Sequence, residues 1–168
     1  MKLLPLDRPD LIELVAGWLC EYDNHKWLDF GGGRPPTPVL LKTMTQRDTH
    51  VLRVFTADDD TTPVGVVGLS DVDRHHKTAM VWAVVGDKSH ARCGYTTRAV
   101  SRMLTLGFRD LGLGAIQSWS VEPNQSGLEV TKRLNFRYIG RQRQCHYVDG
   151  HALDRLLFDL LASEHREV

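Results

Sequence analysis

Several features that define particular classes of protein are scarce or absent in this chain of 168 residues. Its three cysteines, Cys20, Cys93 and Cys145, lie far apart without CxxC spacing, which predicts reduced thiols and neither a disulfide framework nor a structural zinc site. Neither charge sign is in excess, with 21 Lys and Arg against 21 Asp and Glu. Because nucleic-acid affinity comes largely from cations that neutralise phosphates, we expect no DNA partner. We also expect no metal.

Long apolar runs are also missing. No stretch approaches the roughly 18 to 20 apolar residues that cross a bilayer. Residues 1–8, MKLLPLDR, contain a proline and charged residues and therefore lack the apolar core of a secretory signal. The sequence therefore predicts no membrane partner and a cytoplasmic location. With 42% hydrophobic residues and no internal repeat, the chain is expected to form one domain spanning residues 1–168.

The chain does contain an alternation of helix and strand patterns. Helices are expected where apolar residues recur at helical spacing, in residues 9–19, 96–111, 125–134 and 152–162. Strands are expected in the β-branched stretches 51–57, 64–72, 79–85 and 115–121, followed by a β region over 136–148. Such an order predicts an α/β or α+β domain whose central sheet is covered by helices.

Residues 23–50 have poor periodicity, and the stretch GGGRPPTP at 31–38 can form neither a helix nor a central strand. We interpret this loop or helix region as a surface loop or lid that shapes the choice of acceptor. Its glycines are not a phosphate loop, because no Gly-Lys-Ser/Thr follows them. Trp27 and Phe30, beside these glycines, are the candidates for contacts with a substrate.

The junction between the strand ending near Val85 and the helix beginning near Thr96 is the most informative segment. A helix N-terminus carries unpaired N–H groups and partial positive charge, so it suits a phosphate or pyrophosphate. Gly94 would let the backbone approach such an anion, and Thr96 and Thr97 would add hydroxyl donors. The alternative is structural, since strand-to-helix turns use Gly and Thr caps without any ligand.

The motif in this junction, SHARCGYTTRA at 89–99, resembles the loop Gln/Arg-x-x-Gly-x-Gly-Tyr-Ala-Thr-Glu-Ala of the GNAT acyltransferase superfamily. The likeness extends from about Pro63 to the C-terminal end and is closest to the RimJ/RimL N-acetyltransferase branch. Further matches are NQSG at 124–127, KRLNF at 132–136 and DGHALD at 149–154.

The resemblance implies a mixed, mostly antiparallel sheet of about seven strands, flanked by helices and splayed between the fourth and fifth strands. Acetyl-CoA or another acyl-CoA would lie in that opening, with no metal. Backbone groups of Val84 and Val85 would pair with the pantetheine arm, and Asn124 would face the pantetheine or acyl region. The pyrophosphate would be held at the loop by Cys93, Gly94, Tyr95, Thr96 and Thr97, beside Arg92.

The sequence departs from the family pattern at five positions, one of which is Ser89 in place of the Gln or Arg that begins the loop. The first loop Gly is Arg92, the strand Glu is Met80, the helix Tyr is Thr131 and the Ser after Asn124 is Gly127. Arg92 would either crowd the loop or give the pyrophosphate a counter-charge. The usual proton-handling residues are missing, so substitutes are expected near the strand ends that flank the opening. The candidate bases are Asp71, Asp73, His75 and Glu122, and the candidate acids for the departing thiolate are Ser120, Tyr138 and Tyr147.

These features predict an N-acyltransferase, most simply an acetyltransferase, that moves the acyl group directly onto a primary amine. The acceptor would be a protein or peptide N-terminus or a small-molecule amine such as an amino sugar, an antibiotic or a polyamine. Two alternatives stay open. One is a GNAT-fold module that binds acyl-CoA as a sensor or scaffold with little activity, and the other is a transferase that uses an acyl carrier protein or aminoacyl-tRNA as donor. A homodimer is an option that the sequence leaves open.

Overall fold

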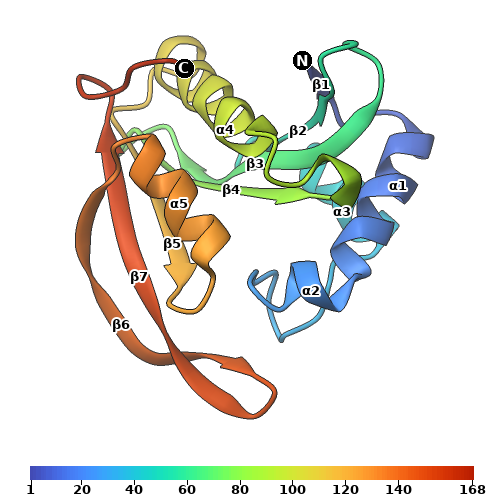
Figure 1. Ribbon diagram of the computed structural model, residues 1–168. Coiled ribbons are helices and arrows are strands. Elements are labelled where there is room, and N and C mark those ends of the chain that lie inside the picture. The colour runs from blue at the N-terminus through green and yellow to red at the C-terminus, as the bar shows by residue number, and fades with distance from the viewer.

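The computed structural model describes residues 1–168 as a single seven-stranded sheet flanked by helices (Figure 1). The strand order is β1-β2-β3-β4-β5-β7-β6, and every neighbouring pair is antiparallel except the parallel pair β4 and β5. The predicted fold class is thereby confirmed. The strands are β1 (Leu3–Pro5), β2 (Val51–Thr56), β3 (Pro63–Asp73), β4 (Thr78–Val85), β5 (Ala115–Val121), β6 (Arg137–Val148) and β7 (His151–Leu161).

The helices cover both faces of the sheet. They are α1 (Pro9–Cys20), α2 (Tyr22–His25), α3 (Pro38–Thr45), α4 (Tyr95–Thr105) and α5 (Gln125–Arg133), with a 3-10 turn η1 (Lys88–His90) and a π-helical turn η2 (Leu106–Asp110). Side chains from α1 and α3 share one buried cluster with β2, β3 and β4, whereas α4 belongs to a second cluster with the other side of the sheet. None of the helices has the length and apolarity that a membrane span needs.

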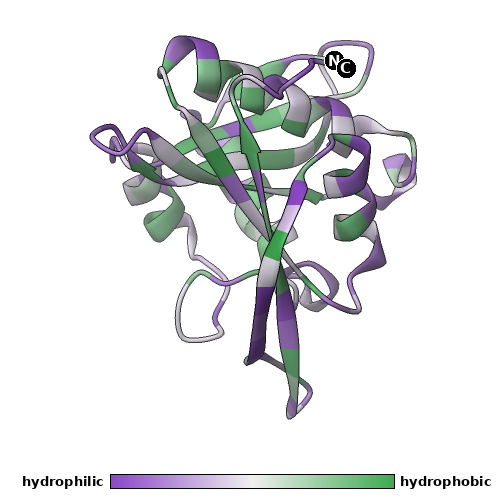
Figure 2. Cartoon of the chain, turned by 90° about the vertical axis from the view of Figure 1, so that its left-hand side faces the viewer, coloured by the Kyte–Doolittle hydropathy of each residue, from purple (hydrophilic) through white to green (hydrophobic).

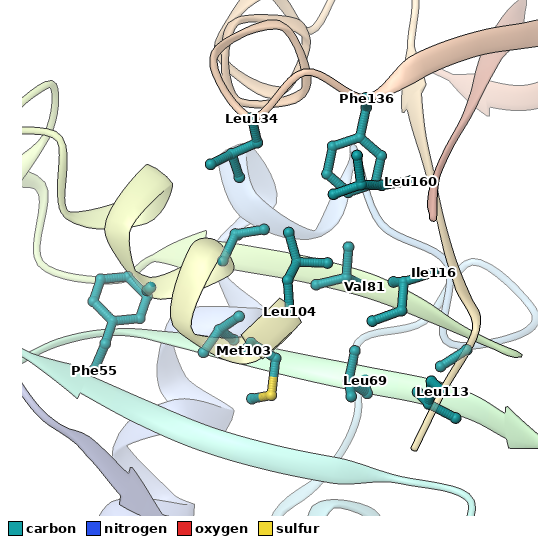
Figure 3. Packing of buried hydrophobic residues seen from close by; sticks show 14 of the residues in the cluster. Phe55, Leu69, Val81, Met103, Leu104, Leu113, Ile116, Leu134, Phe136 and Leu160 are labelled. Carbon is teal, nitrogen blue, oxygen red and sulfur yellow. The ribbon is translucent and has the colours of Figure 1, made fainter. Parts of the chain in front are cut away.

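The alternation of side chains along the strands creates these two clusters. In β2, Leu52 and Val54 pack in the cluster that contains α1. Phe55, on the opposite face of the strand, packs in the cluster that contains α4. Figure 3 shows the second cluster, in which Met103 and Leu104 of α4 lie against Leu69 and Val81 of the sheet. Burial of these apolar faces fixes the position of α4 and therefore of the loop that precedes it.

The sheet opens between its fourth and fifth strands. β4 and β5 pair only through Thr78 with Ala115, Ala79 with Ile116 and Met80 with Gln117. Beyond this pairing the strands diverge, so the backbone edges of residues 81–85 and 118–121 have no strand partner on that side. The expected splay is confirmed.

The predicted helix over 152–162 is wrong, because these residues form strand β7. β7 pairs with β5 on one edge and with β6 on the other. Its leucines have helical spacing, yet pairing on both edges satisfies the backbone of the whole segment. Tertiary hydrogen bonding thus overrides a helical pattern of residues.

The region 23–50 is more regular than a loop. It contains α2 and the eight-residue helix α3, whose N-cap Thr37 accepts a hydrogen bond from the Leu40 N–H at 3.2 Å and whose first residue is Pro38. Residues 31–37 between them do form a loop, and Gly31, Gly32 and Gly33 all have positive φ angles. The glycine- and proline-rich stretch is thus a loop up to Thr37, and its last residue, Pro38, begins α3.

Candidate active site

A cavity of about 1110 Å³ occupies the opening between β4 and β5. Its walls come from the diverging parts of both strands, the start of α4, the helix α5 and the segment that follows α2. A large, partly apolar cavity is the default location for a substrate, and this one coincides with the splayed edge of the sheet.

The start of α4 presents unused hydrogen-bond donors at one end of this cavity. None of the backbone N–H groups of residues 92–97 donates a hydrogen bond within the chain. Gly94, the N-cap, has a φ of 81°, and Arg92 has a φ of 63°, so two left-handed residues curl the loop that carries these amides. Of the predicted residues, the cavity is lined by Arg92, Gly94, Tyr95, Thr96 and Thr97, but not by Cys93.

The open edge of β4 offers further backbone groups. Gly86 donates to the Val64 carbonyl of β3 at 2.9 Å, and since backbone groups alternate in direction along a strand, Val84 faces β3 as well. The free edge therefore belongs to Ala83 and Val85. The Val85 carbonyl accepts a hydrogen bond from Lys88 Nζ at 2.9 Å.

Asn124 and Ser120 lie on the opposite wall. The Asn124 side chain caps α5 by accepting from the Gly127 N–H at 3.3 Å, and Ser120 is buried. A Cβ atom on Gly127 would lie 2.6 Å from Ser120 Oγ. The departure from the family pattern at position 127 thus has a steric reason, because a serine there would displace Ser120.

The candidate bases are separated by the structure. Asp71 lines the cavity, has a φ of 51° and lies where the β3–β4 register shifts, a bulge of the kind that redirects side chains at functional sites. Asp73 instead accepts from the His76 and His75 N–H groups at 2.8 and 2.9 Å, and these bonds lower the pKa of its carboxyl. Neither Asp73 nor His75 lines the cavity.

Glu122 also lies outside the cavity. Its two oxygens accept hydrogen bonds from Arg141 at 2.9 and 3.0 Å, which lowers the pKa of its carboxyl. Tyr138 and Tyr147 are exposed and contribute nothing to the cavity wall. Among the sequence candidates for proton handling, the cavity brings together Asp71 and Ser120.

A residue that sequence reasoning missed, His50, lies in the cavity wall near Asp71. Burial lowers the pKa of His50, the Asp71 carboxylate opposes this effect, and Arg47 adds to it. The lowered pKa favours the neutral imidazole, which is the form that accepts a proton. The sequence held one signal, a histidine immediately before the strand at 51, but the weak periodicity of residues 23–50 concealed its position.

Aromatic rings line one part of the cavity, which we call its aromatic end. Trp27 and Phe30, the candidates for substrate contacts, both line it, and Phe30 meets Trp82 edge-on with ring centroids 5.3 Å apart. Trp119 of β5 adds another wall, with the Arg155 guanidinium 4.0 Å from its ring centroid. No group of three His, Cys, Asp or Glu side chains is arranged to hold a metal ion.

The chain is similar to proteins of known sequence and, in its fold, to solved structures. "Uncharacterized N-acetyltransferase p20" of Bacillus licheniformis is 27% identical over 103 residues, which are 61% of this chain and 57% of that protein, so the match spans little more than half the relative's length. A spermidine N-acetyltransferase from Vibrio cholerae, solved in complex with CoA and spermine, superimposes with a TM-score of 0.84 at 16% identity over 97% of this chain and 96% of that chain.

Two other solved structures share the fold. A structure described as a probable acetyltransferase has a TM-score of 0.78 at 20% identity, covering 95% of this chain and 92% of that chain. A dodecameric structure of the Vibrio cholerae spermidine N-acetyltransferase has a TM-score of 0.81 at 15% identity, covering 97% and 94%. The family model of the acetyltransferase (GNAT) domain matches residues 1–137, well over half of the sequence, and the chain therefore belongs to the GNAT acetyltransferase family.

Proposed function

We propose that this protein transfers an acetyl group from acetyl-CoA directly to a primary amine. The observation that carries the proposal is the row of unbonded N–H groups of residues 92–97, which opens onto the cavity between the diverging strands. Six main-chain donors at a helix N-terminus match the oxygens of a diphosphate, and the family to which the chain belongs supports acyl-CoA as the donor.

The donor would extend from the start of α4 along the open edge of β4. Arg92, which has no ion-pair partner in the chain, would add a full positive charge beside the diphosphate. The amide groups of the pantetheine arm would form hydrogen bonds with the free backbone edge at Ala83 and Val85. The Val85 carbonyl accepts a hydrogen bond from Lys88 Nζ, which the pantetheine amide would replace. Asn124 and Ser120 would form the opposite wall.

The reacting amine enters as an ammonium ion and must lose a proton before it attacks. Asp71, which has no ion-pair or hydrogen-bond partner in the chain, would attract the ammonium, and the neutral His50 imidazole would accept its proton, directly or through water. The amine nitrogen then forms a bond with the thioester carbon, the carbon–sulfur bond breaks, and the thiolate leaves. Ser120 or a water molecule would return a proton to the sulfur.

The charges around the cavity support an acceptor with one ammonium group. Three of its four carboxylates are paired, Asp23 with Lys26 at 2.9 Å, Asp29 with Arg155 at 2.8 Å and Glu129 with Arg133 at 4.0 Å, which leaves Asp71. One free carboxylate suits a peptide N-terminus or a small monoamine better than a polyamine with several cations. The relatives solved with this fold include spermidine acetyltransferases, so spermidine is the informative comparison.

Titration with acetyl-CoA, followed by thiol-release assays with an amine panel, tests the proposal. We expect saturable binding and faster thiol release with monoamines or peptides than with spermidine. Absence of binding at millimolar acetyl-CoA would contradict the proposal. The same sample, measured by light scattering, shows whether the protein forms the homodimer that the sequence leaves open.

One observation favours a second function, that of an acyl-CoA-binding module with little activity. The positions of the family's Glu and Tyr are Met80 and Thr131, and the Thr131 hydroxyl already donates to the Leu128 carbonyl at 2.8 Å. Tight acetyl-CoA binding without thiol release across the whole panel would support this module. A salt-sensitive complex with aminoacyl-tRNA or an acyl carrier protein would instead favour a different donor.

A further inference from the structure

A polar cluster joins the segment after α2 to the β6–β7 hairpin at the aromatic end of the cavity. Its centre is Arg155 of β7, whose Nη2 donates to Asp29 Oδ2 at 2.8 Å. The same guanidinium donates to His146 Nδ1 of β6, from Nε at 3.2 Å and from Nη2 at 3.0 Å. Residues separated by 126 positions in the chain are thus held in direct contact.

Burial and hydrogen bonding fix the geometry of this cluster. His146 is only 6% exposed, and its Nε2 lies 2.7 Å from the Lys26 carbonyl. A carbonyl only accepts, so Nε2 carries the proton and Nδ1 is left as the acceptor for Arg155. The Arg155 side chain is 14% exposed and also covers the Trp119 ring. The arginine therefore has a single well-defined position.

Apart from the cluster, the segment after α2 is held by local main-chain hydrogen bonds, such as that from the Leu28 N–H to the His25 carbonyl at 3.0 Å, and by packing of Leu28 and Phe30 on the core. α2 ends at His25, and residues 26–30 form no helix or strand. This segment carries Trp27 and Phe30, the aromatic side chains of the cavity wall. A second contact, from the Tyr22 hydroxyl to the Asp149 carboxylate, joins α2 to the tip of the same hairpin. Figure 1 shows the hairpin reaching past the other strands on the side where α2 lies.

We propose that Arg155 is a positioning residue for the acceptor. It anchors residues 26–30 to the β6–β7 hairpin, and this anchor sets where Trp27 and Phe30 meet the acceptor. The inference rests on the proposed function in one respect, namely that the aromatic end of the cavity receives the amine. Two of the three guanidinium nitrogens, Nε and Nη2, bond within the cluster, so Arg155 acts through Asp29 and His146 more than through any substrate.

The conservative variant Arg155→Lys tests this role, because lysine keeps the charge but loses the planar fork and the stacking on Trp119. We expect the KM for the amine to rise about tenfold, which is the effect expected from the loss of one well-ordered contact. The kcat and the Kd for acetyl-CoA should change less than twofold, since neither Arg155 nor its partners belong to residues 92–97, whose free amides would hold the donor. Arg141→Lys is the matched control, because Arg141 lies on the other strand of the same hairpin and pairs with Glu122 and Asp154 but does not line the cavity.

A double-mutant comparison separates positioning from direct binding. Asp29→Asn should raise the same KM, and the double variant should be no worse than Arg155→Lys alone. Full additivity of the two effects would mean that Arg155 contacts the acceptor by itself, and an unchanged KM would mean that the anchor is irrelevant to the acceptor. Either result overturns the inference.

Hydrogen–deuterium exchange gives a readout that needs no activity. In Arg155→Lys, amides of residues 26–30 should exchange at least several times faster than in the parent protein, while those of α4 keep their rates. Unchanged exchange in residues 26–30 overturns the inference even in an active enzyme. A parent protein that binds no acetyl-CoA would contradict the proposed function, whatever the exchange shows.

Discussion

Arg92 occupies a backbone conformation that favours glycine. With a φ of 63° it bears a strain of about 1 kcal/mol that a glycine would avoid. The family pattern has Gly at this position, so this chain has a strained residue where the pattern has none. A favourable interaction of the Arg92 charge with the donor diphosphate would offset the loss of folding stability that this strain causes.

The variants Arg92→Gly and Arg92→Ala separate charge from strain. Arg92→Gly should stabilise the fold by about 0.5–1 kcal/mol and Arg92→Ala should not, because alanine keeps the penalty at positive φ. Both variants should bind acetyl-CoA about five- to tenfold more weakly than the parent protein. This difference in affinity between parent and variant should become smaller at high salt. Urea denaturation and calorimetric titration measure the two effects. Tighter binding by Arg92→Gly would show that the arginine crowds the loop instead.

Gly94 has a matched control in Gly112. Both have positive φ, 81° and 66°, and a Cβ on either would meet no atom within 4 Å, but only Gly94 lines the cavity. Leucine at either position should therefore cost similar stability, about 1–2 kcal/mol. Only Gly94→Leu should weaken acetyl-CoA binding, by at least about tenfold, because the side chain covers the free amides. Equal affinities in the two variants would contradict the diphosphate site.

His50 gives a pH signature. Since burial lowers its pKa, the neutral base form persists to more acidic pH than in a free histidine. We expect kcat/KM to fall as the pH drops below 6.5, and this limb should vanish in His50→Gln with a loss of rate of about a hundredfold. The ionisation of the acceptor amine at higher pH should be seen in both proteins. If the pH dependence of kcat/KM were unchanged in His50→Gln, Asp71 would be the group that accepts the proton from the acceptor amine.

At the scale of elements, α1 docks on the end of β4 through Trp18 and Gly86. A Cβ on Gly86 would lie 1.9 Å from the Trp18 ring, so the ring occupies the space that a side chain would need. Gly17, the neighbour of Trp18 in α1, has no atom within 4 Å of its Cβ position. The same substitution is thus expected to have opposite effects at the two glycines.

Gly86→Ala should destabilise the protein by about 1–3 kcal/mol, because the ring or the strand must move. Gly17→Ala should stabilise it by up to about 1 kcal/mol through helix propensity. Midpoints of urea unfolding at unchanged m-values measure both changes. A neutral Gly86→Ala would mean that Trp18 does not fix α1 against the sheet.

The β6–β7 hairpin shows how an element can contradict its own local pattern. In β7 the register places Leu156 opposite Ser120 of β5 and Arg141 of β6, so the strand lies between two partners. Figure 2 shows that the far part of the hairpin extends beyond the other strands and is largely hydrophilic there. Helical spacing of leucines is a local signal, whereas strand pairing is decided by distant segments.

At the scale of the whole molecule, acid should unfold the protein in two stages. Burial lowers the pKa of His50 and of His165, so the unfolded state binds more protons and stability falls as the pH drops from about 6.5. Several paired carboxyls also have lowered pKa values, and their contribution is present above about pH 4 and lost below it. These carboxyls are Asp29, Asp58, Asp59, Asp60, Glu122 and Asp154.

Urea unfolding at several pH values measures this dependence. We expect little change between pH 7 and 8, a shallow decrease towards pH 5 and a steep one below pH 4. In His50→Gln the shallow stage should be reduced, because one of the two imidazoles with a lowered pKa is gone. A stability maximum near pH 5 would contradict the assigned direction of the histidine pKa values.

The sequence by itself determined the strand, loop and helix around Gly94, the three strands before them and the family. These depend on short-range rules, such as alternation along a strand and the need for glycine at positive φ, which operate within a few residues. The tertiary structure alone decided that residues 152–162 form a strand, that His50 joins Asp71 in the cavity wall, and that Arg155 anchors Asp29. Each of these depends on contacts between segments far apart in the chain, and such contacts leave no periodic signal in either segment.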